Sequence, residues 1–216
     1  IELSAKAFGL ESTDISQASS AIRENLGVSA QEATNLSLSF ARTAAATGQT
    51  ADQLSNTLVA LEAVSSASRE VLLNQLRTNA AIIGRAGVTP SVVLQDIAQN
   101  TEFFATFAKE GGDNILRAAI AAKSLGSELG TVSGIAESLL DFESSIEAQL
   151  EASLLLGRQI NLDRARQLFF VGKTEQGLQE VLKQVGSEAE FTRLLPIQRQ
   201  KLASAVGLNV EQLSRL

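Results

Sequence analysis

The sequence contains no cysteine, histidine, methionine, tryptophan or tyrosine, and only two of its 216 residues are proline. Without cysteine the chain cannot form a disulfide, a thiolate nucleophile, an iron–sulfur cluster or a structural zinc site. Without histidine it lacks the commonest general base and the commonest transition-metal ligand. Because Asp, Glu, Lys, Arg, Ser and Thr are all that is left for chemistry, the composition argues against an enzyme and predicts no cofactor and no metal.

Positive charge is scarce too. The 18 Lys and Arg are outnumbered by 24 Asp and Glu, which gives a net charge of −6 and a pI near 4.8. Such a chain has no general attraction to nucleic acid or anionic membrane, and no apolar run approaches the ~20 residues that span a bilayer. We therefore expect neither a specific nucleic acid nor a membrane among its partners. The chain opens at Ile1 without an initiator methionine, so we expect a piece of a longer polypeptide or a processed product.

What the sequence has in quantity is a corner signal, a glycine followed closely by a Ser, Thr or Asn that can cap a helix. The corner glycines are Gly27, Gly48, Gly87, Gly157, Gly172, Gly186 and Gly207. Glycine adopts the left-handed conformation that ends a helix, and the next polar residue accepts a free backbone N–H of the following helix. Four caps have a Glu or Gln three positions later, in the pairs Ser29–Glu32, Thr50–Gln53, Ser187–Glu190 and Asn209–Gln212. The pattern predicts an all-α fold of many short helices joined by glycine corners.

Apolar residues recur at three- and four-residue steps, as amphipathic helices require. Shorter helices are expected at 90–109, 114–125, 162–171, 175–185, 196–206 and 210–216. The longest pattern predicts one long amphipathic helix over about 135–156, with an apolar seam of Leu139, Phe142, Ile146, Leu150 and Leu154. Segment 126–134 holds three glycines and is the strongest hinge candidate. We expect an N-terminal helical region over 1–110 and a second helical module over 113–216.

A row of carboxylates lies on the same predicted helix, at Glu143, Glu147 and Glu151. Four-residue spacing places them on one face, which could hold a hard cation or an acid–base pair of carboxylates. Di-metal helical bundles need a His three residues after a Glu, so we favour a solvated face or one that meets basic residues of a partner. Three arginines follow the helix and could neutralise the row: Arg158, Arg164 and Arg166.

Adjacent phenylalanines occur twice, at Phe103–Phe104 and Phe169–Phe170. Successive residues of a helix point about 100° apart, so both rings of a pair cannot face one core. One ring of each pair is therefore a candidate for contact between chains. Packing between two layers of the same chain is the alternative.

Residues 198–216 resemble a helix-turn-helix around Gly207. In that alternative the protein is a DNA-binding regulator that places residues 209–215 in a major groove. The segment offers one basic residue, Arg215, and an acidic Glu211 that phosphate would repel, whereas DNA affinity needs several Lys or Arg together. A generic helix corner explains it better.

Several runs in the second half resemble a recurring segment of phage proteins. They are 119–126 (AIAAKSLG), 135–146 (IAESLLDFESSI), 149–152, 157–162 (GRQINL), 165–166, 185–187, Phe191, 198–202 and 205–208. The family is the tail tape measure proteins and related internal virion proteins of tailed bacteriophages. The resemblance covers 113–216 and is most specific over 137–161. The first hundred residues share only a helical pattern with the family.

The resemblance implies a long, mostly helical protein inside the tail tube, in a few copies around the tail axis. In that family chain length sets tail length, the protein leaves the tube on DNA ejection, and its C-terminal part meets the baseplate hub. Short capped helices suggest a compact, hub-anchoring region and not the measuring rod. The implied location is the virion tail lumen or baseplate, reached from the host cytoplasm during assembly.

The partners so implied are further copies of the chain, as a trimer by preference or a hexamer, together with tail tube and baseplate hub proteins. The expected interaction residues are Leu139, Phe142, Ile146, Leu150 and Leu154, with Glu143, Glu147 and Glu151 offered to a basic partner. Because some members of the family carry wall-degrading domains, a third interpretation is an enzyme. It would need Glu137 or Glu143 in a cleft with a raised pKa.

Overall fold

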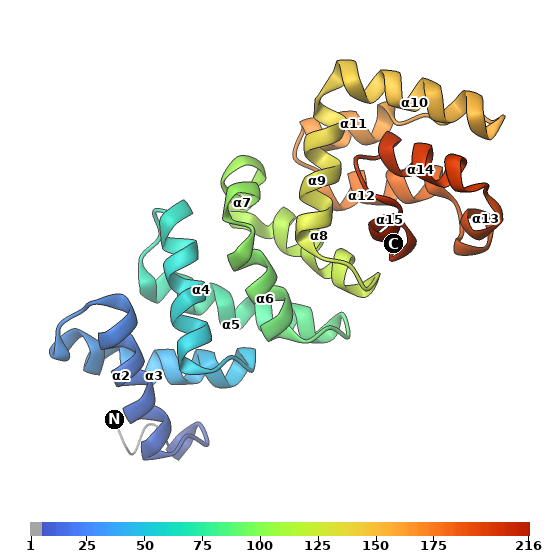
Figure 1. The fold of residues 1–216 in the computed structure, drawn as a ribbon. Helices are drawn as coiled ribbons and strands as arrows, with labels where there is room; N and C mark the ends of the chain where they lie inside the picture. Colours follow the sequence, from blue (N-terminus) through green and yellow to red (C-terminus); the bar gives the residue numbers. More distant parts are fainter. Residues whose placement is uncertain (1–5) are drawn as a thin grey trace. The chain divides into compact units, whose positions relative to one another are not determined.

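The computed structural model describes residues 6–216, and this part of the chain contains fourteen α-helices, one 3-10 helix and no strand (Figure 1). The prediction of an all-α fold is confirmed. Contacts divide the chain into two compact units, Ile1–Thr101 and Glu102–Leu216, so the division lies ahead of the boundary expected near residue 110. Among the described helices, none combines the length and the apolarity needed to cross a bilayer.

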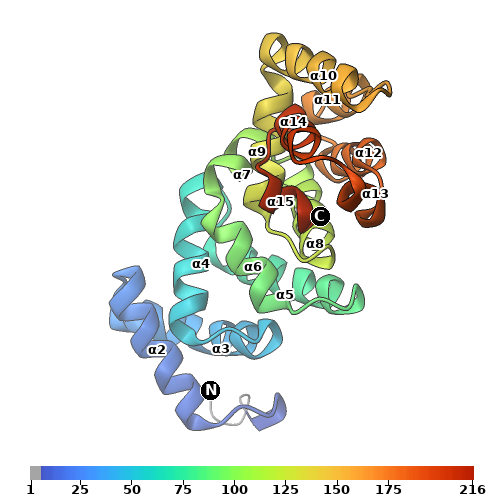
Figure 2. The ribbon, with the colours of Figure 1, turned by 45° about the vertical axis from the view of Figure 1, so that its right-hand side comes forward.

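The first unit contains helices α2 (Ser12–Leu26), α3 (Ala30–Thr47), α4 (Ala51–Val64), α5 (Arg69–Arg85) and α6 (Pro90–Gln99). α2 packs on α3 and α4, α3 packs on α5, and α6 lies against both α4 and α5 (Figure 2). Large side chains that are almost fully buried form its core, among them Ile22, Phe40, Leu54, Leu58 and Ile83. Each helix contributes one apolar face, as the three- and four-residue spacing predicts.

The second unit contains the remaining elements: α7 (Thr101–Phe107), η1 (Glu110–Gly112), α8 (Asp113–Ser124), α9 (Leu129–Leu140), α10 (Phe142–Leu156), α11 (Asp163–Phe170), α12 (Thr174–Val185), α13 (Glu188–Arg193), α14 (Pro196–Ala205) and α15 (Val210–Ser214). α9 is its central helix and contacts α8, α10, α11 and α12. The side chains that α9 buries completely include Leu129, Val132, Ile135 and Leu139.

The glycine corners are confirmed. All seven predicted glycines have φ between +63° and +88°, a conformation that side chains with a Cβ rarely adopt. The Thr50–Gln53, Ser187–Glu190 and Asn209–Gln212 pairs form complete reciprocal capping boxes. At the fourth corner, the Ser29 hydroxyl accepts the Glu32 N–H at 3.2 Å. These four caps therefore set helix boundaries. At the other three corners the polar residue makes no cap: Thr89 forms no side-chain cap bond, and the N-cap positions are Leu162 and Lys173.

The single long helix expected over 135–156 is wrong, because the chain breaks at Asp141 (φ −78°, ψ 84°) between α9 and α10. The Asp141 carbonyl accepts the Ser145 N–H at 2.9 Å, and its carboxylate accepts the Ser144 hydroxyl at 2.7 Å. The break lets α9 run through the core while α10 turns along the edge of the unit. A similar break at Asn100 divides the helix expected over 90–109 into α6 and α7.

The hinge candidate at 126–134 is mostly helical, because α9 begins at Leu129. Gly130 and Gly134 lie inside that helix. A Cβ added at Gly134 would lie 3.9 Å from the Gly207 carbonyl oxygen. That distance is an ordinary van der Waals contact, so α9 lies close to the corner between α14 and α15. Burial of the apolar side chains of α9 outweighs the low helix propensity of its two glycines.

Candidate protein-interaction site

Helix α10 runs along the edge of the second unit, where it packs against α14 and α9 (Figure 1). Its only fully buried residues are Ser145 and Ala152. A surface helix of a globular protein normally turns its large apolar side chains inward and its polar ones outward. α10 departs from this pattern, because it buries a serine and an alanine while several of its large apolar side chains are exposed. Polar contacts therefore have a large part in holding it to the unit.

The first of these contacts fixes the start of α10. Arg166 of α11 is buried, and its Nε donates to the Ser145 hydroxyl at 2.9 Å while a second nitrogen donates to the Ser145 carbonyl at 3.1 Å. The third guanidinium nitrogen pairs with Asp163 at 2.7 Å. Burial lowers the pKa of Arg166, and the attraction of Asp163 acts in the opposite direction. All three guanidinium nitrogens are thus used within the fold.

Further polar contacts fix the second half of α10. Gln149 accepts the Leu162 N–H through its side-chain oxygen at 3.1 Å, and Ser153 accepts the Ile160 N–H through its hydroxyl at 3.0 Å. From α14, the Gln198 side-chain amide donates to the Leu155 carbonyl at 2.9 Å. The first two bonds satisfy N–H groups of the loop that follows the helix, and the third satisfies a carbonyl in the last turn of α10.

The outer face of α10 carries four large apolar side chains at four-residue intervals. Their exposed fractions are 49% for Phe142, 45% for Ile146, 58% for Leu150 and 83% for Leu154. We call this set the apolar ridge. A shallow groove of ≈ 460 Å³ opens beside its C-terminal end, lined in part by Leu150, Leu154 and residues 157–160.

Leu139 does not belong with the ridge, although the predicted seam grouped them. It is completely buried in α9, because the break at Asp141 changes the direction of the chain between Leu139 and Phe142. The expectation that Leu139 is a contact residue is therefore wrong. Its role is in the core of the second unit.

The predicted glutamate row is present on α10, and all three members are exposed. Glu151 pairs with Lys201 of α14 at 2.6 Å, whereas Glu143 and Glu147 form no ion pair with any described residue. The arginines expected to neutralise the row are used elsewhere: Arg158 donates to the carbonyls of Gln184 and Val185, Arg164 to Gln167, and Arg166 to Ser145 and Asp163. Two carboxylates thus remain available beside the ridge.

The two phenylalanine pairs differ in whether their second ring is exposed. Phe103 is buried, and the ring of Phe104 lies where a Cβ on Gly112 would meet it at 2.6 Å, so both rings pack within the chain. In the second pair Phe169 is buried and Phe170 is 71% exposed. Phe170 is thus the one ring of these pairs that is open to a partner.

The helix-turn-helix candidate is a compact corner. α15 has five residues and buries Leu213, and Arg215, which follows the helix, pairs with Glu211 of α15 at 2.6 Å. Gly207 faces α9, where an added Cβ would approach the Ser138 side chain to 2.2 Å. The DNA-binding alternative stays a prediction, and the geometry adds no cationic face to it.

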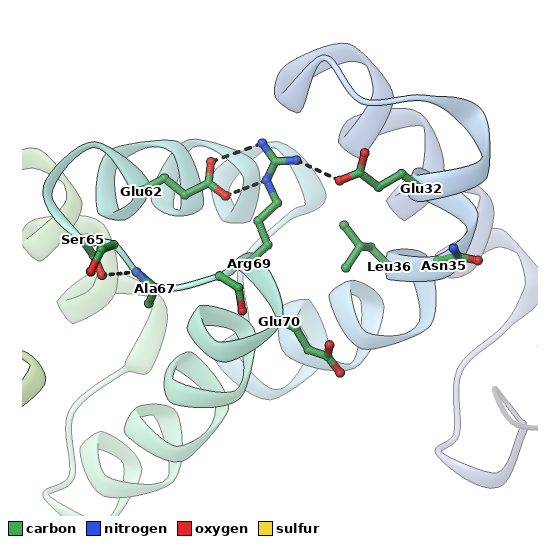
Figure 3. Close-up of a pocket in the computed structure, with 10 residues that line it drawn as sticks. Glu32, Asn35, Leu36, Glu62, Ser65, Ala67, Arg69 and Glu70 are labelled. Carbon is green, nitrogen blue, oxygen red and sulfur yellow. Dashed lines mark hydrogen bonds and ion pairs between the residues drawn. The ribbon is translucent and has the colours of Figure 1, made fainter.

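The first unit has a polar pocket of ≈ 590 Å³ between α3 and the turn that joins α4 to α5 (Figure 3). At its wall Arg69 binds Glu62 through two nitrogens, at 2.6 and 3.3 Å, and reaches Glu32 at 3.4 Å. Both glutamates therefore share the guanidinium between them. We interpret the trio as a clamp that ties the turn to α3.

The residues considered for catalysis lie on the surface. Glu137 and Glu143 are both exposed, and Glu137 accepts a hydrogen bond from Ser133 at 2.7 Å. Within residues 6–216, no group of three or more acidic side chains is placed to hold a metal ion. The most distinctive surface feature of the second unit is the apolar ridge with its two available glutamates.

No protein-family model, curated protein or solved structure matches this chain. The resemblance of residues 113–216 to tail tape measure proteins stays a prediction.

Proposed function

We propose that this chain is a structural, non-enzymatic component of a phage tail, a hub-anchoring region of a tape measure-like protein that acts by binding other proteins. One observation supports the binding role: α10 exposes an apolar ridge while polar contacts hold its inner side. The identity of the assembly rests on the resemblance of residues 113–216.

The ridge supports a binding role because its exposure is costly. Full burial of a Leu, Ile or Phe side chain contributes roughly 1.5–3 kcal/mol, and α10 turns Ser145 and Ala152 inward instead. Contiguous exposed apolar surface marks protein interaction sites far more often than scattered single residues do. A partner that covered the ridge would recover part of this free energy, because the ridge side chains are 45–83% exposed.

The resemblance also implies where the chain acts and which proteins it contacts. The chain would associate in a few copies around the tail axis, as a trimer by preference or a hexamer, and contact tail tube and baseplate hub proteins. It would enter the tail in the host cytoplasm and leave with the DNA on ejection. Light scattering after size-exclusion chromatography tests the self-association, and a monomer at tens of micromolar would contradict it.

Two measurements test the tail assignment. Mass spectrometry of purified tails from the source should find peptides of this chain, and their absence would refute the assignment. In the phage, the double substitution Leu150→Ser and Leu154→Ser should reduce tail assembly without loss of helix content. Val92→Ser is a matched control, because Val92 is 46% exposed on α6, and this variant should assemble normally. Normal assembly of the double variant would refute the role of α10.

A further inference from the structure

The outer surface of α10 is organised as two parallel rows. Four residues of an α-helix turn through about 400°, so residues four apart form a ridge that slants slowly around the helix. The first row is the apolar ridge, and the second follows one residue later with Glu143, Glu147 and Glu151. The acidic row therefore runs beside the apolar one along the helix.

We propose that α10 binds a helix of a different protein, one that carries an apolar ridge bordered by Lys or Arg, and that the two helices cross at about −50°. This inference rests on the proposed binding role of α10 and specifies the chemistry of the partner. The apolar ridges would interdigitate, and the basic side chains would meet Glu143 and Glu147.

The spacing of the ridge decides the crossing angle. A coiled coil needs apolar residues at alternating steps of three and four, which keep the seam facing its partner over many turns. Every step in the ridge of α10 is four residues, from Phe142 to Leu154. When rows with that spacing pack into each other, the helices cross at about −50° instead of running side by side.

Charge disfavours an antiparallel pairing of α10 with the α10 of a second copy and favours a partner helix with basic residues. The ridge is symmetric about position 148, so two antiparallel α10 helices would match apolar residues with apolar residues. A two-fold axis would, however, place both acidic rows on the same side of the contact. α10 contains no Lys or Arg, and Lys201 of α14 already pairs with Glu151. Glu147 of each copy would therefore lie next to Glu147 of the other without a basic partner. Like charges at an interface oppose association, whereas a basic row in the same position would favour it.

The groove beside the ridge fits an apolar anchor from such a helix. Its polar lining groups include the Gln149 and Ser153 side chains, whose oxygens already accept the Leu162 and Ile160 N–H groups. An apolar side chain that entered beside Leu150 and Leu154 would therefore leave these acceptors satisfied. Well-packed anchors of this kind carry much of the affinity of an interface.

Two synthetic peptides test the charge requirement. Both copy residues 142–156, and the first replaces Glu143, Glu147 and Glu151 by Lys while the second retains them. A covalent staple between positions 148 and 152, on the face opposite the ridge, holds each as a helix, because isolated peptides of this length are marginally helical. Fluorescence anisotropy with the full chain at low salt should show at least tenfold tighter binding of the Lys peptide. The preference should shrink as salt is raised.

Variants of the full chain make the test reciprocal. Glu143→Lys with Glu147→Lys should reverse the preference, so that the Glu peptide binds more tightly. Leu150→Ser with Leu154→Ser should weaken the binding of both peptides at least tenfold, and Val92→Ser should change neither. Equal affinity for the two peptides, no binding of either, or an unchanged preference in the charge-reversed variant would overturn the inference.

These outcomes are separable from the tail assignment. If the chain prefers the Lys peptide but is absent from purified tails, the docking surface is supported and the proposed function is refuted. If the chain is present in tails but shows no preference between the peptides, only the inference about the partner is refuted.

Discussion

Arg166 of α11 donates to both the hydroxyl and the carbonyl of Ser145, at 2.9 and 3.1 Å, and thereby connects the core of the second unit to the start of α10. Ser145 is one of two fully buried residues of that helix. The apolar ridge can face outward because this contact, and others like it, hold the helix from its polar side. The contact predicts how α10 responds to substitution.

Replacement of Arg166 by Leu should destabilise the second unit by about 2 kcal/mol, because buried hydrogen bonds to a charged donor are lost. Asp163 is largely exposed, so loss of its Arg166 partner would leave the carboxylate in water and would not create a buried unpaired charge. Urea denaturation measures the change, and hydrogen exchange should accelerate over residues 142–148. Arg164→Leu is the control, since Arg164 is exposed and donates a hydrogen bond to the exposed Gln167. Equal midpoints for the two variants would contradict the prediction.

Replacement of Gly207 by Ala should be far more destabilising than replacement of Gly126. The two glycines have nearly the same φ, +75° and +74°, so the strain of a left-handed alanine is common to both. A Cβ at Gly207 would lie 2.2 Å from the Ser138 Cβ, while one at Gly126 would meet nothing within 4 Å. We expect the clash to add about 1–3 kcal/mol, measured as the difference in unfolding free energy. Equal losses would show that α9 does not approach the corner.

Replacement by alanine should be far more destabilising at Leu139 than at Leu154, although both belong to the predicted seam. Leu139→Ala should cost about 2–5 kcal/mol, because it leaves a cavity in the core. Leu154→Ala should change stability by less than about 0.5 kcal/mol, because that side chain is 83% exposed. Thermal unfolding of the two variants compares them directly. A large loss for Leu154→Ala would place it in a buried contact.

The cap of α13 should be sensitive to acid. Hydrogen bonds from the Ser187 N–H and hydroxyl, at 2.8 and 2.9 Å, lower the pKa of Glu190 below its ordinary value. The contribution of the Glu190 carboxylate to the stability of the cap is therefore complete above its unfolded pKa of ~4.3. That contribution is lost as the pH falls through the lower folded pKa. The NMR shift of the Ser187 amide reports this transition.

The equivalent cap at Thr50 provides the control. Its partner Gln53 makes the same reciprocal hydrogen bonds without a titratable group, so the Thr50 amide should not shift over this pH range. Glu190→Gln should make Ser187 behave in the same way. A Ser187 amide that already follows Thr50 in the unmodified protein would rule out the carboxylate as its acceptor.

The sequence alone determined the helical class, the corners and the caps. These depend on contacts within four residues, as when Asn209 accepts the Gln212 N–H at 2.8 Å. Propensity and spacing identify such contacts without any knowledge of the rest of the chain. The exposed glutamate row and most of the apolar ridge could be predicted for the same reason, because helical spacing decides which residues share a face.

Only the tertiary structure decided which faces are buried. Leu139 and Phe142 are three residues apart on one predicted seam, yet the break at Asp141 sends the first into the core and the second to the surface. The partners that hold α10, such as Arg166, carry no local sequence signal, since they reach it from elements that fold back onto it from later in the chain. Periodicity describes how apolar and polar side chains are distributed around the axis of one helix, whereas burial depends on which neighbour packs against each side.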